Sequence, residues 1–216
     1  MYSKRKRSIK KINITSLYNN LNKLNIGLLG GSFDPAHNGH KYISEVAIKT
    51  LGLNQLWWLV TPNNPLKEKD QLLTIEKRLA STAFIKNNYK IKPQAIELKL
   101  GTKFTYDTIK KLKQTMPRVN FYWIMGADSL ENMHKWHNWK KIFYLCPILV
   151  LNRSKYFYKA LNSKTSKYFW KKRIDVNKIN RINKKELPVW CFLNIKPNYM
   201  SSTIIRKKKG YSESKC

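Results

Sequence analysis

The chain has 216 residues, 42% of them hydrophobic, which is enough to form one domain with a buried core. Its formal net charge is +31, and it has no run of 18 apolar residues, so we expect no segment to cross a membrane. The cysteines Cys146, Cys191 and Cys216 are scattered, which argues against a disulfide framework or a zinc knuckle and makes a reducing cytoplasm the expected compartment.

The large positive charge has two interpretations. Basic side chains neutralise phosphates and release counterions, so the charge is compatible with binding to nucleic acid. However, lysine outnumbers arginine by 35 to 8, whereas a surface selected to bind nucleic acid is expected to use more arginine. Asparagine, isoleucine and tyrosine are also abundant, and all have A/T-rich codons. We therefore favour compositional drift over specific nucleic-acid binding.

Strands and helices are predicted to alternate along the middle of the chain. Residues 1–24 are a basic extension, 25–209 the folded domain and 210–216 a tail, and 152–185 are expected to form a basic, irregular surface insertion. The alternation predicts one α/β domain with a doubly wound, Rossmann-like parallel sheet and helices on both faces. The predicted strands are 26–30, 55–60, 95–100, 119–125, 147–151 and 189–193. The predicted helices are 39–51, one starting at 74, 105–116, 129–134, 139–143 and 201–209.

The segment GGSFDPAHNGH, from Gly30 to His40, follows the first predicted strand. Ligands of doubly wound sheets bind at the carboxyl ends of strands. Glycines let the backbone approach a phosphate, and the free N–H groups at the start of the following helix attract anions. His37 and His40 lie on one helix face and can donate to phosphate oxygens, whereas a zinc site lacks a third ligand nearby. The segment predicts a phosphate site.

Two later segments add polar groups of the same kind. Gly126–Asp128 follows another predicted strand, and Asp128 is either an acceptor for a ribose hydroxyl or an ordinary helix N-cap. Ser201, Ser202 and Thr203 start the last predicted helix, which is either a capped basic helix or, together with Arg206, a second anion site.

GGSFDPAHNGH resembles the signature of the H-x-G-H nucleotidyltransferases and, within them, of the nicotinate-nucleotide adenylyltransferases. Three further segments match that family in order, namely TPNNPLK (61–67), IMGADSLENMHKWHNW (124–139) and MSSTIIR (200–206), and TYDTI (105–109) also fits. The resemblance covers about residues 25–209, nearly the whole predicted domain.

The resemblance implies that ATP and nicotinate mononucleotide react to give nicotinate adenine dinucleotide and pyrophosphate. It implies catalytic roles for His37, His40 and Arg206, with Mg²⁺ carried on ATP and no dedicated protein ligands for the metal. The residues expected to bind ATP are Gly30, Gly31, Ser32, Phe33, His37, His40, Gly126, Asp128, Ser201, Ser202, Thr203 and Arg206. Those expected to bind the mononucleotide are Lys67, Thr105, Tyr106 and Trp136.

Several alternatives stay open at this point. The nearest is the same chemistry on nicotinamide mononucleotide, and a more distant one is the same chemistry on pantetheine phosphate. A different class is a nucleic-acid-binding protein driven by charge, which the two separated anion motifs disfavour. The sequence is compatible with a homo-oligomer and does not fix the oligomeric state.

Overall fold

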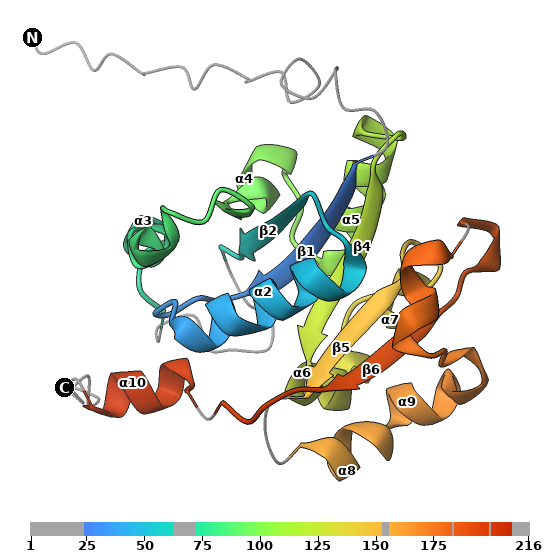
Figure 1. Ribbon diagram of the computed structural model, residues 1–216. Helices are drawn as coiled ribbons and strands as arrows, with labels where there is room; N and C mark the ends of the chain where they lie inside the picture. Colours follow the sequence, from blue (N-terminus) through green and yellow to red (C-terminus); the bar gives the residue numbers. More distant parts are fainter. Residues whose placement is uncertain (1–23, 63–71, 153–155, 183, 199, 209–216) are drawn as a thin grey trace, which may run out of the picture.

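The computed structural model describes residues 24–62, 72–152, 156–182, 184–198 and 200–208. Within these residues six strands form one parallel sheet in the order β3-β2-β1-β4-β5-β6 (Figure 1). The strands are β1 (Asn25–Gly31), β2 (Gln55–Val60), β3 (Ile91–Gln94), β4 (Asn120–Gly126), β5 (Ile148–Asn152) and β6 (Trp190–Asn194). The strand order reverses between β1 and β4, which is where sheets of this kind bind ligands.

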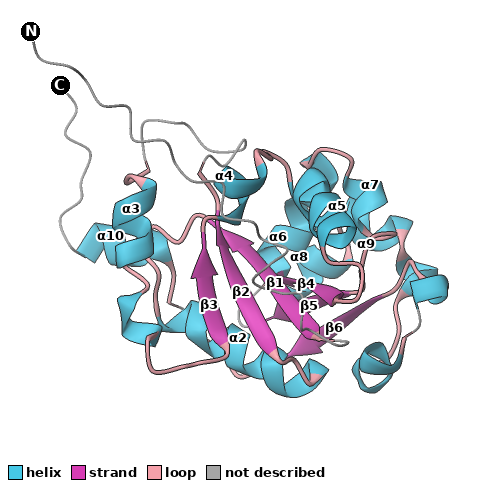
Figure 2. Ribbon diagram, turned by 90° about the horizontal axis from the view of Figure 1, so that it is seen from above, coloured by secondary structure: helices cyan, strands magenta, loops and turns pink. Residues whose placement is uncertain are grey.

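Helices cover both faces of the sheet (Figure 2). They are α2 (Asn38–Leu51), α3 (Ile75–Ala80), α4 (Ile96–Leu100), α5 (Thr105–Thr115), α6 (Ala127–Asn132), α7 (Trp139–Ile142), α8 (Phe157–Leu161), α9 (Lys164–Tyr168) and α10 (Ser202–Lys208). None of the helices in the described ranges is long and apolar enough to cross a membrane. The predicted α/β fold, doubly wound and Rossmann-like, is confirmed.

The central strands consist almost entirely of apolar residues because each is covered on both faces. In β2, Trp57 and Trp58 are both fully buried, and their side chains enter opposite faces because neighbouring residues of a strand alternate. Trp57 belongs to the core beneath α4 to α9, and Trp58 to the core beneath α2. The sheet therefore separates two apolar cores, and its carboxyl edge carries the polar turns.

The predicted strand 95–100 is wrong, because a helix, α4 (Ile96–Leu100), occupies these residues and the third strand, β3, ends just before it at Gln94. The apolar residues at every second position resemble a strand, but Leu98 is 56% exposed while Ile96 and Leu100 are buried. Burial four residues apart is the helical period. Gly101 ends this helix in the left-handed region, with φ of 63°.

The segment 152–185 was predicted to be irregular, and this expectation is also wrong for the part that the structure describes. It contains α8, α9 and two short 3₁₀ helices, Trp170–Lys172 and Val176–Arg181. Ala160 and Phe169 are buried in one core and Ile179 in the other. The segment therefore wraps the β6 edge of the sheet. The predicted extension and tail lie outside the described residues, apart from Leu24.

Candidate active site

The turn between β1 and α2 brings both motif histidines to the carboxyl edge of the sheet. His37 is the N-cap of α2 and is buried, and its Nδ1 accepts the backbone N–H of Gly39 at 3.1 Å. His40, one turn later, accepts the backbone N–H of His37 on its own Nδ1 at 3.2 Å. The two rings lie 3.8 Å apart between centroids. The histidines thus form a capping box made of imidazoles.

This arrangement changes how the helix terminus can meet an anion. We expected free N–H groups at the start of α2, but the N–H groups of His37 and Gly39 are donated to the two rings. An imidazole that accepts on Nδ1 carries its proton on Nε2 in the neutral form. The helix N-terminus therefore lies directly behind both rings, and the proton of each neutral ring is on the Nε2 side, away from the helix backbone.

The core beneath the turn fixes the position of His40. The ring of Phe33 lies 4.7 Å from that of His40 and stacks on Trp58 at 4.9 Å. Trp58 donates its indole N–H to Ser44 Oγ at 2.8 Å, and Ser44 in turn donates to the carbonyl of His40 at 2.8 Å. Phe33 is only 2% exposed, so its side chain packs under the histidines and is not available to a ligand.

Gly30 and Phe33 show why the turn needs its particular residues. A Cβ added at Gly30 would lie 2.6 Å from the indole of Trp123 on β4, so the indole occupies the space that the glycine leaves. We had interpreted Gly30 only as a close approach to phosphate, and the structure adds this packing reason. Phe33 adopts φ of 49°, a left-handed conformation that costs energy for a residue other than glycine. Its buried ring offsets that cost.

The last helix of the described chain, α10, joins this turn from the far end of the sequence (Figure 1). Ser202 Oγ donates to the carbonyl of Pro35 at 2.9 Å. Arg206 donates from Nη1 to the carbonyl of Asp34 at 2.5 Å and lies 3.5 Å from the Asp34 carboxylate. Thr203 lies in the first turn of α10, and Ser201, just before the helix, accepts the backbone N–H of Ile204 on its Oγ at 3.2 Å. The predicted second anion motif therefore stands beside the first, although more than 160 residues separate them.

Arg78, on α3, is a site residue that the sequence reasoning missed. It is 1% exposed and donates four hydrogen bonds to backbone carbonyls, at 2.6 to 3.1 Å, and the acceptors belong to Ser32, Thr61, Pro62 and Leu73. Burial lowers the pKa of its guanidinium, and the carboxylates of Asp34 and Glu76 oppose that shift. Arg78 thus ties the residues after β1 and β2 together. Among 35 lysines and 8 arginines, nothing in the sequence marked it.

Gly126 and Asp128 occupy the position predicted for a ribose contact. Gly126 ends β4 and is the N-cap of α6, and Asp128 is exposed in the first turn of that helix. A Cβ at Gly126 would collide with the Asp128 carboxylate. β4 neighbours β1 in the sheet, so Asp128 lies at the same edge as the histidine turn.

The residues predicted for the mononucleotide cluster around the start of α5. Thr105 and Tyr106 form its first turn, and the ring of Phe104 just before them stacks on His137 at 4.5 Å. This contact brings Trp136 close to the start of α5. Trp136 is partly buried and meets Trp123 edge-on at 6.1 Å. Lys67 lies outside the described residues.

Glu97 is a second residue that the sequence reasoning missed. It lies on α4 and is only 7% exposed. Burial raises its pKa to about 7, and a hydrogen bond with Thr61, just after β2, opposes the shift. Its Oε2 has no hydrogen-bond partner among the described residues. The glutamate thus connects α4 to the carboxyl end of β2, next to the carbonyls that Arg78 holds.

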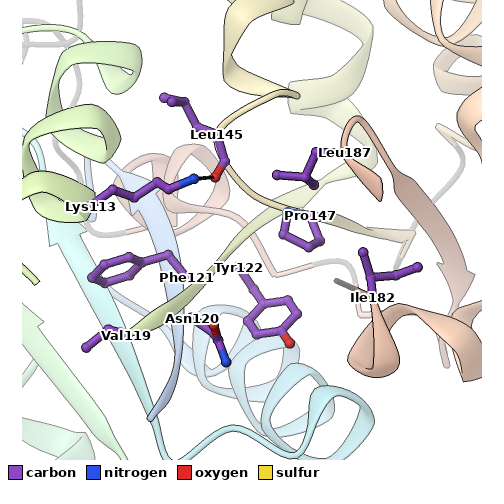
Figure 3. Close-up of a pocket in the computed structure, with 9 residues that line it drawn as sticks. All are labelled: Lys113, Val119, Asn120, Phe121, Tyr122, Leu145, Pro147, Ile182 and Leu187. Atoms are coloured by element: carbon purple, nitrogen blue, oxygen red, sulfur yellow. Dashed lines mark hydrogen bonds between the residues drawn. The ribbon is translucent and has the colours of Figure 1, made fainter. Parts of the chain in front are cut away.

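The cavity shown in Figure 3 lies at the opposite end of the sheet. It is lined by Asn120 at the start of β4 and by Pro147 just before β5, and Lys113 donates to the carbonyl of Leu145 across it. Its volume of about 30 Å³ is the size of one water molecule. This cavity is too small for a nucleotide. The candidate site is therefore the carboxyl edge of the sheet.

The sheet order, the histidine turn and the helix docked on it define a nucleotidyltransferase. The cytidylyltransferase-like family model matches residues 28–208, which is most of the described chain. The chain is 42% identical over 189 residues to a protein of Rhizobium johnstonii, described as a probable nicotinate-nucleotide adenylyltransferase, with 88% of this chain and 95% of that one covered. The chain belongs to the nicotinate-nucleotide adenylyltransferase family.

Further comparisons agree with this placement. A relative from Ruegeria with the same description is 39% identical over 189 residues, covering 88% of this chain and all of that one. Among solved structures, Plasmodium falciparum nicotinic acid mononucleotide adenylyltransferase complexed with NaAD superposes with a TM-score of 0.63 at 22% identity. That alignment covers 85% of this chain and 83% of the other, and it bears on the fold alone.

Proposed function

We propose that this protein transfers AMP from ATP to nicotinate mononucleotide, giving nicotinate adenine dinucleotide and pyrophosphate, a step of NAD biosynthesis. The relatives' descriptions support the reaction class. The observation that carries the proposal is the docking of α10 on the β1–α2 turn, which brings Arg206 and Ser202 beside His37 and His40. Two anion motifs at one edge suit a reaction in which two phosphate groups must meet.

The reaction needs positioning more than acid–base chemistry. An oxygen of the mononucleotide 5′-phosphate attacks the α-phosphorus of ATP, the bond from that phosphorus to the bridging oxygen breaks, and pyrophosphate leaves. The nucleophile is largely ionised at neutral pH, because a phosphate monoester has a second pKa of about 6. No proton has to be removed first, so catalysis consists of aligning two anions and stabilising the charge that develops.

The protein's own residues divide this work in the proposal. His37 and His40 donate from Nε2 to oxygens of the reacting phosphates, with the helix N-terminus of α2 behind them. Arg206, anchored on the Asp34 carbonyl, supplies a cation on the other side of the turn. Ser201 and Thr203 add hydroxyl donors at the start of α10, and Ser202, whose hydroxyl donates to the Pro35 carbonyl, adds a backbone donor. Asp128 accepts from a ribose hydroxyl.

The pyridine end of the second substrate is proposed to lie near the start of α5. Thr105 and Tyr106 lie there beside Trp136, whose ring is partly buried against the core and offers a flat partner to a pyridine. Lys67, outside the described residues, remains a proposed contact of the mononucleotide.

Mg²⁺ enters in the proposal as part of the ATP substrate, where it neutralises the triphosphate. Within the described ranges no three His, Cys, Asp or Glu side chains are grouped to hold a metal ion. The acid nearest the histidines in the chain, Asp34, is 1% exposed and lies beside Arg206. In the proposal Mg²⁺ stays with the triphosphate, and the protein's own side chains do the positioning.

The test is pyrophosphate release from ATP in the presence of each candidate acceptor. The proposal predicts turnover with nicotinate mononucleotide, and faster turnover with it than with nicotinamide mononucleotide or pantetheine phosphate. Equal or faster turnover of the amide would refute the acid specificity. No turnover with any acceptor, together with binding to nucleic acid that weakens steeply with salt, would favour the charge-driven alternative.

A further inference from the structure

A second cavity lies on the far side of the sheet from the histidine turn, beside the edge strand β6. It has a volume of about 500 Å³ and is lined by Leu161, Ser166, Lys167, Trp170, Arg173 and Trp190. Volumes of 300 to 1,000 Å³ are typical of sites for small organic ligands. Trp190 begins β6, and Asn194 ends it at the carboxyl edge, about 13 Å away at roughly 3.3 Å per residue. Along β6 the cavity therefore lies at the amino end, away from the carboxyl edge where the catalytic residues are proposed.

The aromatic side chains of this cavity differ in their freedom. Trp190 is 1% exposed, and its indole N–H donates to the carbonyl of Phe169 at 2.8 Å, so its ring is fixed. Trp170 is 66% exposed, and Lys171 Nζ lies 5.6 Å from the centroid of its ring. A large flat ring at the mouth of a cavity is suited to stacking on an aromatic ligand.

The charged side chains of the cavity are all positive. Lys167 and Arg173 line it, and no acidic side chain does. Arg173 lies over the rings of Trp190 and Phe192, at 5.8 and 5.7 Å from their centroids. A guanidinium that lies over aromatic rings at these distances still has N–H groups that can donate to a phosphate. The stretch 164–173 contains five Lys or Arg residues and no acid.

We infer that this cavity binds a nucleotide, with the base stacked on Trp170 and the phosphate held by Arg173 and Lys167. The combination of an exposed ring, an arginine held over two buried aromatic rings and a second cation in one cavity carries this inference, since isolated surface lysines are common in this chain. The ligand is either a free mononucleotide or one unit of a single strand, because both present the same ring and phosphate. The inference is independent of the reaction proposed for the other edge.

The experiment follows the indole N–H signal of Trp170 by NMR in the full chain. The chain has seven tryptophans, and the Trp170 signal is assigned by its loss in Trp170→Phe. AMP is expected to shift this signal saturably, whereas ribose 5-phosphate and adenosine, which each lack one half of the ligand, bind at least about tenfold more weakly. An eight-residue single-stranded oligoadenylate distinguishes the sources: tighter binding than AMP indicates a strand, and equal binding indicates a free nucleotide.

Matched variants locate the binding. Arg173→Lys keeps the charge but loses the forked donors of the guanidinium, and Lys167→Ala removes an exposed cation; each is expected to weaken AMP binding by about tenfold. Tyr89→Ala removes an equally exposed ring with its own lysine, 6.0 Å away, and should change nothing. Trp170→Ala should leave adenylyl transfer unchanged. A Trp170 signal that does not move up to about 10 mM AMP, or that responds equally to ribose 5-phosphate, would overturn the inference.

Discussion

Replacing Arg78 by lysine tests whether one buried side chain organises the catalytic edge. Its guanidinium donates through Nε, Nη1 and Nη2 to four carbonyls spread over the ends of β1, β2 and the approach to α3. A lysine carries its donors on a single nitrogen and lacks this fork. If the lysine keeps two of the four hydrogen bonds, the variant loses two hydrogen bonds from a charged donor, each worth about 1.5 kcal/mol. The free energy of unfolding should therefore fall by about 3 kcal/mol.

The same change should also weaken substrate binding. The carbonyls of Ser32 and Thr61 follow directly on β1 and β2, so releasing them loosens the histidine turn. We expect Arg78→Lys to raise the KM values as well as to lower stability. Urea unfolding and steady-state kinetics measure both effects, with Arg118→Lys as the control because Arg118 is exposed. An Arg78→Lys variant whose free energy of unfolding lies within about 0.5 kcal/mol of the wild-type value would refute the reasoning, because ordinary surface substitutions fall in that range.

Three further predictions follow from the geometry. Burial raises the pKa of Glu97 from 4.5 to about 7. As the pH rises, the unfolded chain therefore loses this proton before the folded protein does. The free energy of unfolding is expected to fall by up to about 3 kcal/mol between pH 4.5 and pH 7. Glu97→Gln should abolish that slope and be the more stable protein at pH 8 in urea unfolding; identical pH profiles would contradict this. Gly30→Ala, whose Cβ meets Trp123 at 2.6 Å, should lower stability by about 1–3 kcal/mol in the same assay, and an unchanged midpoint would show that the indole moves freely. Trp136→Ala should raise KM for the pyridine mononucleotide about three- to tenfold with less effect on KM for ATP; a large drop in melting temperature with unchanged KM would instead assign Trp136 to the core.

The alternation of elements was predictable because each buried strand is a short apolar run followed by a turn signal. The β1–α2 turn was the clearest case, since GGSFDPAHNGH fixes a strand end, a turn and a helix start within eleven residues. The error at 95–100 arose because a five-residue helix is too short to show its period. The exposure of Leu98 and the burial of Glu97 distinguish the helix from a strand.

The site was predictable where a motif is local and not where it depends on tertiary contacts. The sequence identified His37, His40 and Arg206 as candidates, and the structure places Arg206 beside the histidine turn through Asp34. It did not indicate Arg78 or Glu97, because their importance comes from burial at strand ends. Nor did it indicate that His37 and His40 accept the backbone N–H groups that we had assigned to the ligand.

The turnover number of His40→Ala is the most direct test of the central claim that these imidazoles stabilise the transferring phosphate. Loss of one transition-state donor should lower kcat by about 10²-fold or more, while far-ultraviolet circular dichroism shows an intact fold. His134→Ala, which removes a partly buried histidine whose Nδ1 lies 3.1 Å from the Glu131 carbonyl, is the matched control and should keep its kcat. A folded His40→Ala protein with near wild-type kcat would contradict the account.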